Sequence, residues 1–166
     1  QAQKVCLTGA NGDALSARIA ACESWQVYDP AAPLPAYYKA LLLNQAGEYG
    51  SAFDVFTHVL AMQGDLPMAW YHRGRIALEH RADPVTAIED LSQAIILRGD
   101  DPIADARVFR GLAYVELARS GVTPDAHYAH ARDDFRMVLE RADPSLPVKN
   151  REALRSAIAW IDAKLS

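Results

Sequence analysis

The 166-residue sequence lacks long hydrophobic runs, an excess of charge of one sign, and all but two cysteines. Apolar runs such as Ala40–Leu43 are far shorter than the roughly 20 residues of a membrane-spanning helix. Acidic and basic residues are interspersed and the formal net charge is −4, so the sequence offers no broad basic surface to a nucleic acid. With 51% hydrophobic and 23% charged residues, the composition is that of one folded globular unit.

Catalytic signatures are also missing. The sequence contains no nucleophile elbow, phosphate-binding glycine loop, dinucleotide fingerprint or two-histidine zinc motif. His127 and His130 stand close enough to share a metal, but ordinary surface chemistry at the start of a helix explains them better. Asp83 and Asp101 each precede a proline, as expected of residues that cap helices. The sequence therefore predicts no catalytic centre, no metal site and no cofactor.

The two cysteines, Cys6 and Cys22, lie near the start of the chain. Their spacing suits either one disulfide or two unrelated thiols, and the sequence alone does not decide between them. The chain begins with Gln1, as expected of an exported protein after removal of a signal peptide, and equally of a trimmed chain. We expect a periplasmic or otherwise exported protein with a disulfide, because only an oxidising compartment preserves one. A cytoplasmic protein with two structural thiols is the alternative.

Apolar residues recur with a helical period along nearly the whole chain, and alternating β-branched clusters are missing. This pattern predicts an all-α protein. Glycines and prolines fall between the periodic segments, where they end or begin helices. Three prolines at positions 30, 33 and 35 predict an extended connection over residues 28–34. The pattern predicts seven or eight helices, near residues 13–25, 36–46, 50–62, 67–80, 84–97, 103–119, 125–141 and 150–165.

An internal repeat determines the expected architecture. The segment Ala69–Leu78 reappears in similar form as Ala106–Val115, and each copy precedes a second amphipathic helix. These second helices share a small residue, a large apolar residue four positions later, and an apolar residue three beyond that. The small residues are Ala52, Ala87 and Ala131, and their unequal spacing indicates an insertion near residues 120–127 of the third unit.

This pattern resembles the tetratricopeptide repeat (TPR), whose signature is Trp-x-x-Leu-Gly-x-x-Tyr, then Ala-x-x-x-Phe, then Pro. The resemblance covers about residues 34–144, although arginine replaces the motif leucine at Arg73 and Arg110. The matching residues are Gly47, Tyr49, Ala52 and Phe56 in the first unit, Trp70, Gly74, Ala87, Leu91 and Ala94 in the second, and Gly111, Tyr114, Ala131, Phe135 and Pro144 in the third.

The resemblance implies a right-handed α-solenoid of antiparallel helix hairpins. A repeat cannot bury its apolar face alone, so both ends of the array need caps. The last helix suits this role because its apolar residues form one stripe. We expect an N-terminal capping helix and proline-rich link over residues 1–33, TPR-like repeats over 34–148, and a C-terminal capping helix over 149–166.

In this family the first helices of successive hairpins line a concave groove that binds a peptide or a helix of another protein. The resemblance thus implies a noncatalytic adaptor or accessory subunit that binds a protein partner and helps assemble a larger complex. The positions that match the groove are Tyr37, Leu41, Asn44 and Gln45 in the first unit, Met68, Tyr71, Arg75 and Glu79 in the second, and Asp105, Val108, Leu112 and Glu116 in the third.

Three alternatives remain open. The concave cavity would serve an enzyme or a small-ligand-binding protein if Arg75, Glu79 and Glu116 were its polar groups. The groove residues would instead pack internally if the insertion or a terminal segment folded back onto them. Stacking of terminal hairpins would make the molecule its own partner, although the polar outer face of the last helix argues against that.

Overall fold

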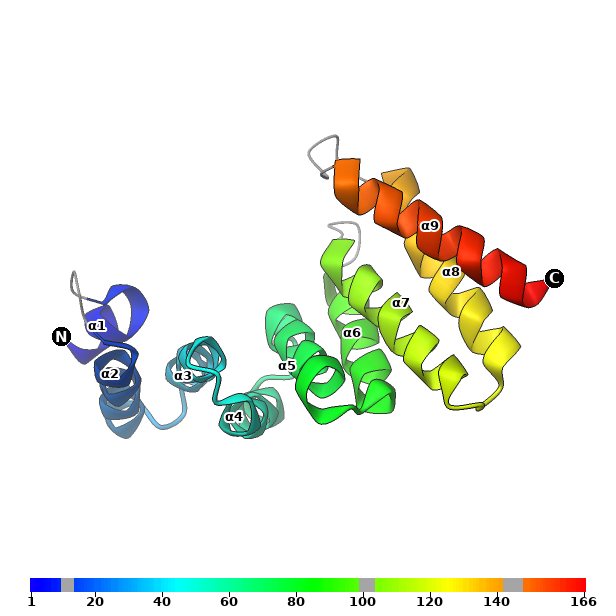
Figure 1. Ribbon diagram of the computed structural model, residues 1–166. Coiled ribbons are helices and arrows are strands. Elements are labelled where there is room, and N and C mark those ends of the chain that lie inside the picture. Colours follow the sequence, from blue (N-terminus) through cyan, green and yellow to red (C-terminus); the bar gives the residue numbers. More distant parts are fainter. Residues whose placement is uncertain (10–13, 99–103, 142–147) are drawn as a thin grey trace.

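The computed structural model describes residues 1–9, 14–98, 104–141 and 148–166. Every regular element within these ranges is a helix, which confirms the predicted fold class. Neighbouring helices pair as hairpins, and the hairpins stack into a crescent with α1 and α9 at its two ends (Figure 1). The helices are α1 (Ala2–Thr8), α2 (Leu15–Tyr28), α3 (Pro33–Gln45), α4 (Tyr49–Met62), α5 (Pro67–Arg81), α6 (Pro84–Arg98), α7 (Ala104–Arg119), α8 (Pro124–Arg141) and α9 (Val148–Leu165).

Proline begins four of these helices, because the first turn of a helix needs no amide hydrogen from it. Pro33 and Pro35 both belong to the first turn of α3. The connection between α2 and α3 is therefore shorter than the extended segment predicted over 28–34. The prediction used all three prolines as evidence for an extended link, whereas Pro33 and Pro35 lie in the first turn of α3.

Asp83 caps α6 as the sequence predicts. Its carboxylate accepts hydrogen bonds from the backbone amide of Thr86 at 3.0 Å and from the Thr86 hydroxyl at 2.7 Å. These bonds favour the charged form and hold the pKa of Asp83 below its usual value. Asp101 lies outside the described residues.

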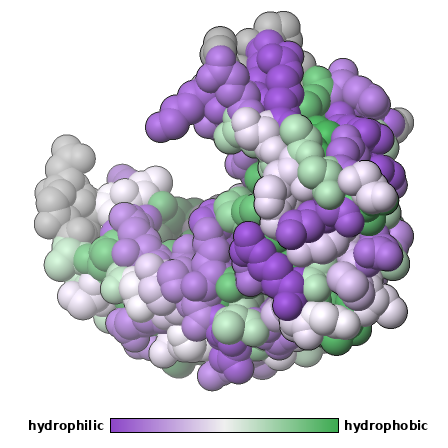
Figure 2. Space-filling view, turned by 45° about the vertical axis from the view of Figure 1, so that its right-hand side comes forward, coloured by the Kyte–Doolittle hydropathy of each residue, from purple (hydrophilic) through white to green (hydrophobic). Residues whose placement is uncertain are grey.

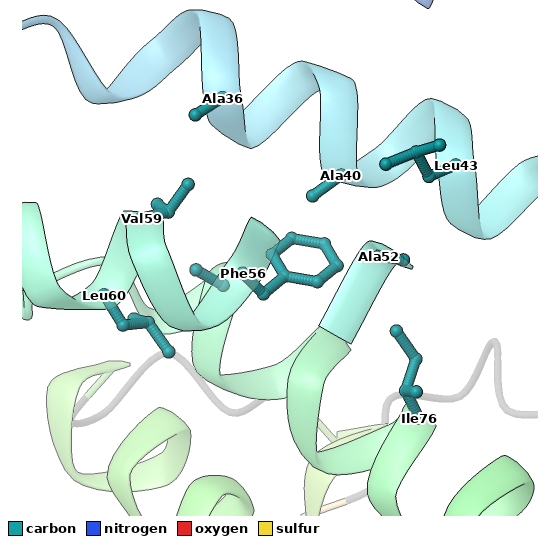
Figure 3. Close-up of a cluster of buried hydrophobic side chains, with 9 residues drawn as sticks. Ala36, Ala40, Leu43, Ala52, Phe56, Val59, Leu60 and Ile76 are labelled. Carbon is teal, nitrogen blue, oxygen red and sulfur yellow. The ribbon is translucent and has the colours of Figure 1, made fainter. Parts of the chain in front are cut away.

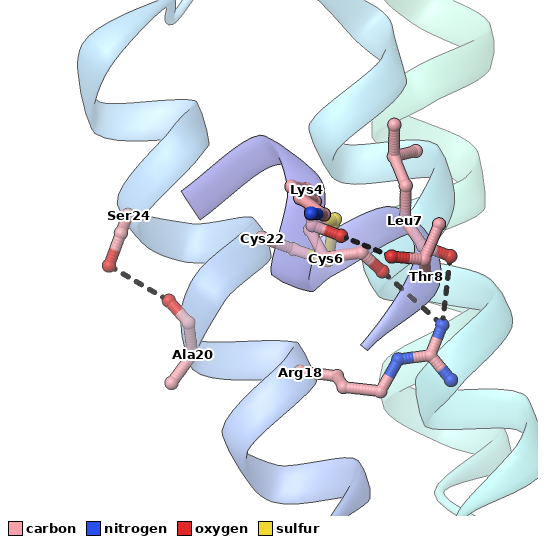
Figure 4. Close-up of a disulfide and its surroundings, with 8 residues drawn as sticks. All are labelled: Lys4, Cys6, Leu7, Thr8, Arg18, Ala20, Cys22 and Ser24. Carbon is pink, nitrogen blue, oxygen red and sulfur yellow. Dashed lines mark hydrogen bonds between the residues drawn. A yellow bond between two sulfur atoms is a disulfide. The ribbon is translucent and has the colours of Figure 1, made fainter. Parts of the chain in front are cut away.

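Helix α1 was not predicted, and a disulfide secures it. Cys6 of α1 is bonded to Cys22 of α2, with 4.8 Å between their Cα atoms, and both residues are fully buried (Figure 4). Arg18 also donates hydrogen bonds to the carbonyl oxygens of Cys6 and Leu7 at 3.3 and 3.2 Å. The disulfide indicates an oxidising compartment. Together with Leu42 of α3, the two cysteines form a small core that joins α1 and α2 to the first hairpin.

The hairpin interiors follow the repeat motif. Phe56 of α4 lies fully buried among Ala40, Ala52 and Ile76, so it fills the space between the first hairpin and α5 (Figure 3). At Gly111 of α7, an added Cβ would stand 2.9 Å from two atoms of the Phe135 ring on α8. Glycine at this motif position therefore allows the two helices of a hairpin to approach closely.

Each of the two arginines that replace the motif leucine forms a paired contact within its own hairpin. Arg73 Nε and Nη2 of α5 donate to the Asp90 carboxylate of α6, both at 2.7 Å. Arg110 of α7 binds Asp134 of α8 in the same manner, at 2.8 and 2.6 Å. Burial nevertheless raises the pKa of Asp90 against the opposing effect of Arg73. Much of the attraction within each pair is cancelled by the hydration that the two charged groups lose. The pairs therefore contribute more to the alignment of the two helices than to the stability of the fold.

The insertion in the third unit lengthens its hairpin. From Gly111 to Ala131 the chain needs seven more residues than from Gly74 to Ala87. Four of them extend the start of α8, which begins at Pro124, one lengthens α7, and two widen the turn between these helices. The third hairpin consequently projects beyond the second by about one helical turn.

Helix α9 closes the array at the C-terminal end. Leu154 and Ile161 are buried against α7 and α8, and Ile158 and Leu165 pack beside them, as the apolar stripe predicts. None of the helices in the described parts of the chain combines the length and the apolar character needed to cross a bilayer. The division into caps and repeats at residues 33 and 148 stays a prediction.

Candidate protein-binding face

The first helices of the three hairpins, α3, α5 and α7, line the inner side of the crescent. Helices α5 and α7 contact each other directly, through the rings of Tyr71 and Phe109 at 6.2 Å and through Arg75 above Phe109 at 4.5 Å. In the described parts of the chain, α4 and α6 do not pack on each other to this extent. The array is therefore curved toward its first helices, and a hollow lies between its two arms (Figure 2).

A row of aromatic rings runs beneath this face from α3 to α7, by way of the buried Phe56 of α4. Tyr37 meets Phe56 at 6.1 Å, Phe56 stacks on His72 at 5.7 Å, and His72 meets Tyr71 at 5.2 Å. Tyr71 in turn meets Phe109. Such ring contacts stabilise beyond the area that they bury, so the row gives the face a rigid base.

Burial in this row changes the protonation of its polar members. It lowers the pKa of His72 to about 4, because the charged imidazolium would lose its hydration and would also face Arg75. Burial raises the pKa of Tyr37 and of Tyr71 above the usual tyrosine value. All three side chains are therefore neutral at pH 7.

Several predicted groove residues belong to this base or to the cores beneath it. Tyr71 is only 6% exposed and packs with Met68 in the core of the second hairpin. Tyr37 and Leu41 are half-buried against the core of the first hairpin, and Val108 lies against the core of the third. These five residues thus pack against the cores of their own hairpins, beneath the accessible part of the face.

The remaining predicted residues offer accessible atoms. Leu112 is 43% exposed, Asn44 is half-buried, and the others are exposed at least in part: Gln45, Arg75, Glu79, Asp105 and Glu116. Arg75 Nη2 donates to Glu79 at 2.9 Å, while its Nε is buried without a hydrogen-bond partner. The accessible part of the face is therefore mixed, with an aliphatic anchor and charges of both signs.

The acidic and basic groups named for a ligand-binding cavity are engaged with neighbours. Arg75 binds Glu79, and Glu116 accepts a hydrogen bond from Arg119 at 3.1 Å. His127 and His130 both lie against the Tyr114 ring, at 5.8 and 5.1 Å. Among the described residues, no group of three or more side chains is arranged to hold a metal ion.

The sequence analysis did not identify Trp160 of α9 as a surface residue. Its indole is 41% exposed and meets the Tyr128 ring of α8 edge-on at 5.5 Å. Arg119 of α7 and Lys164 of α9 each place their charged group 5.6 Å from the centre of the indole. The available signal was that Trp160 is a large aromatic residue outside the apolar stripe of the last helix.

No protein-family model matches the sequence, and comparison with curated proteins gives no match. Solved structures of other proteins do match the fold. The first TPR of Spaghetti (RPAP3), bound to an HSP90 peptide, aligns with 80% of this chain and 92% of its own at a TM-score of 0.62 and 19% identity. The chain has the tetratricopeptide-repeat fold. MamA from Desulfovibrio magneticus RS-1 aligns with 99% of this chain and 92% of its own, at a TM-score of 0.66 and 18% identity.

A TPR segment of a larger protein is similar as well. An O-GlcNAc transferase of Thermobaculum terrenum aligns with 89% of this chain at a TM-score of 0.60 and 25% identity. The alignment covers only 26% of the transferase chain. These likenesses establish the repeat architecture, which hosts many unrelated binding roles.

Proposed function

We propose that this protein is a noncatalytic adaptor or accessory subunit whose concave TPR face binds a segment of a protein partner and helps assemble a larger complex. One observation carries the proposal. The inner helices keep accessible side chains in corresponding positions of successive hairpins, above a continuous aromatic row. A rigid base under exposed apolar and charged groups favours binding, because little conformational entropy is lost when a partner docks.

The likeness to a TPR that holds a peptide supports the same reading, as a parallel from fold. We propose a periplasmic or otherwise exported protein, since a fully buried disulfide between Cys6 and Cys22 fits an oxidising compartment. The pairing of Arg75 with Glu79 favours binding over catalysis, since these two charges compensate each other.

The proposal is tested by affinity capture from the native cell with the wild-type chain and two matched variants. Leu112→Glu places a carboxylate on the concave face, whereas Ile96→Glu makes the same kind of change on α6, where Ile96 is 68% exposed. Both changes are at exposed positions, so both variants should keep the wild-type circular dichroism spectrum.

We expect the Leu112→Glu variant to lose a specific protein partner by about tenfold or more, and the Ile96→Glu variant to retain it. Equal retention by both variants would show that the partner does not use this face. Loss with both variants would show that binding responds to an added surface carboxylate in general, which would contradict a specific role for this face.

A further inference from the structure

A cationic aromatic surface lies where the third hairpin meets α9. It consists of Arg119, Trp160 and Lys164, which we call the α9 patch. The two cationic groups flank an indole that keeps 41% of its surface exposed. Helix α9 thus offers more than the apolar stripe and polar outer face that a terminal cap requires.

The patch lies beside the insertion that breaks the repeat period. Arg119 is the last residue of α7, and Tyr128 directly follows residues 124–127, by which α8 begins earlier than α6 does. Tyr128 supports the indole of Trp160 from the side.

The charges around the indole are not balanced internally. Among the described residues no ion pair is recorded for Lys164, and Arg119 pairs with Glu116, where both side chains are more than half exposed. An exposed pair of this kind contributes little stability and can exchange partners. The nearby Asp162 is directed to Arg132 and Arg136 on α8, at 3.2 Å from each. The α9 patch therefore carries net positive charge beside an apolar surface.

The patch is continuous with the proposed binding face. Glu116 lies one helical turn after Leu112 on α7 and binds Arg119, which contacts Trp160. A partner segment that covers Leu112 and continues toward the end of α7 would meet the indole next. Between Leu112 and Trp160 the segment would pass over the hydrogen-bonded pair of Glu116 and Arg119.

We propose that the α9 patch is part of the binding face and takes a partner segment in which a large apolar side chain stands next to a carboxylate. This inference rests on the proposed function and specifies its partner. The indole supplies flat apolar contact, and the ammonium and guanidinium groups supply charge-assisted hydrogen bonds to the carboxylate. Aromatic and arginine side chains together are typical of interface hot spots.

The test is selection of peptides from a displayed random library on the purified full chain, with four variants. Trp160→Ala removes the indole, Lys164→Glu reverses the exposed charge, and Leu112→Glu disrupts the groove itself. Arg155→Glu is the matched control, because Arg155 is an exposed base on α9 that belongs to the polar outer face. The most enriched peptide is then synthesised with a fluorescent label, and its dissociation constant is measured by polarisation for each variant.

We expect the wild-type chain to enrich peptides with Leu, Phe or Trp beside Asp or Glu. Trp160→Ala should weaken the labelled peptide by about tenfold or more, and Arg155→Glu should leave it within about twofold. Lys164→Glu should weaken it too, and should shift the selection toward peptides with Lys or Arg beside the apolar residue. Lys164 is exposed, so this variant tests the patch even if removal of the indole disturbs folding.

The failures are distinguishable. If Leu112→Glu abolishes binding while Trp160→Ala and Lys164→Glu do not, the groove binds a partner without the α9 patch, and the inference is wrong while the proposed function stands. If no peptide is enriched, or if enriched peptides bind every variant equally, both proposals fail.

Discussion

Replacement of Gly111 by alanine tests the argument about close helix approach. A Cβ at this position would overlap the Phe135 ring, including two ring atoms only 2.9 Å away. Phe135 is 1% exposed and fills the interior of the third hairpin, so the ring has little room to move. The variant must either tilt this ring or separate α7 from α8.

The magnitude follows from two opposing effects. Alanine favours the helix over glycine by about 1 kcal/mol. Overpacking of a filled core costs about 1–3 kcal/mol, and a clash with a ring that cannot move lies at the upper end of that range. We therefore expect a net loss of about 2 kcal/mol in the free energy of unfolding, and a fall of roughly 4–8 °C in the melting temperature.

Gly50 provides the matched control. It also lies in a helix, α4, but a Cβ there would meet nothing within 4 Å. Gly50→Ala should leave the protein as stable as the wild type or slightly more stable, because only the gain in helix propensity applies. Urea unfolding followed by circular dichroism measures both variants. If Gly111→Ala matched Gly50→Ala in stability, the interpretation of the motif glycine as a packing requirement would be refuted.

Three further predictions concern buried groups. The pKa of His72 lies below that of an unfolded histidine, so stability present above about pH 6.5 should be lost as the pH falls toward 4, by about 2 kcal/mol between pH 7 and 4.5. Urea unfolding at the two pH values should show this loss reduced in His72→Phe; an identical pH dependence would contradict it. Reduction of the Cys6–Cys22 disulfide should raise hydrogen exchange in α1 and α2 while the amides of α5 to α8 stay protected, because a solenoid contacts mainly its neighbours. Uniform exchange would argue against a local cap. Asp134→Ala should cost about 3 kcal/mol in thermal unfolding, at the lower end for a broken buried pair, because Arg110 keeps 19% exposure and its hydrogen bond to Ser92. The double change Asp134→Leu with Arg110→Met should recover most of that loss. No recovery would mean that the ion pair itself supplies the stability.

The repeat period carried most of the fold prediction. The recurrent small and large residues indicated the hairpins because each type has a fixed role in packing. Large residues such as Phe56 fill the space between helices, and small residues such as Gly111 allow the two helices of a hairpin to approach closely. Helix α1 was missed because it has only seven residues and one buried side chain, so it produces no periodic pattern. Only Cys6 marked it, and its pairing with Cys22 depends on a contact that the sequence does not fix.

The binding face was predicted less completely, for reasons of packing depth. Register placed Tyr71 on the inner side of α5, but did not reveal that Phe109 and His72 would enclose it. The exposure of Trp160 depends on its contacts with Tyr128 of α8 and Arg119 of α7. Contacts of this kind form between helices, so the periodicity of one helix alone does not predict them.

The arginine and aspartate pairs also determine where the crescent is stiff. They lock helix to helix inside the second and third hairpins, at Arg73 with Asp90 and at Arg110 with Asp134. Contacts between successive hairpins are ring stacks, apolar surfaces and single hydrogen bonds, which Arg73 donates to Thr57 at 3.2 Å and Arg110 donates to Ser92 at 3.0 Å. Single bonds of this kind hold the seams less firmly than the paired bonds hold each hairpin. Thermal bending should therefore concentrate at these seams, so that each hairpin moves as a rigid plate. The arms of the crescent can then spread or close around partners of different thickness while every hairpin keeps its internal geometry.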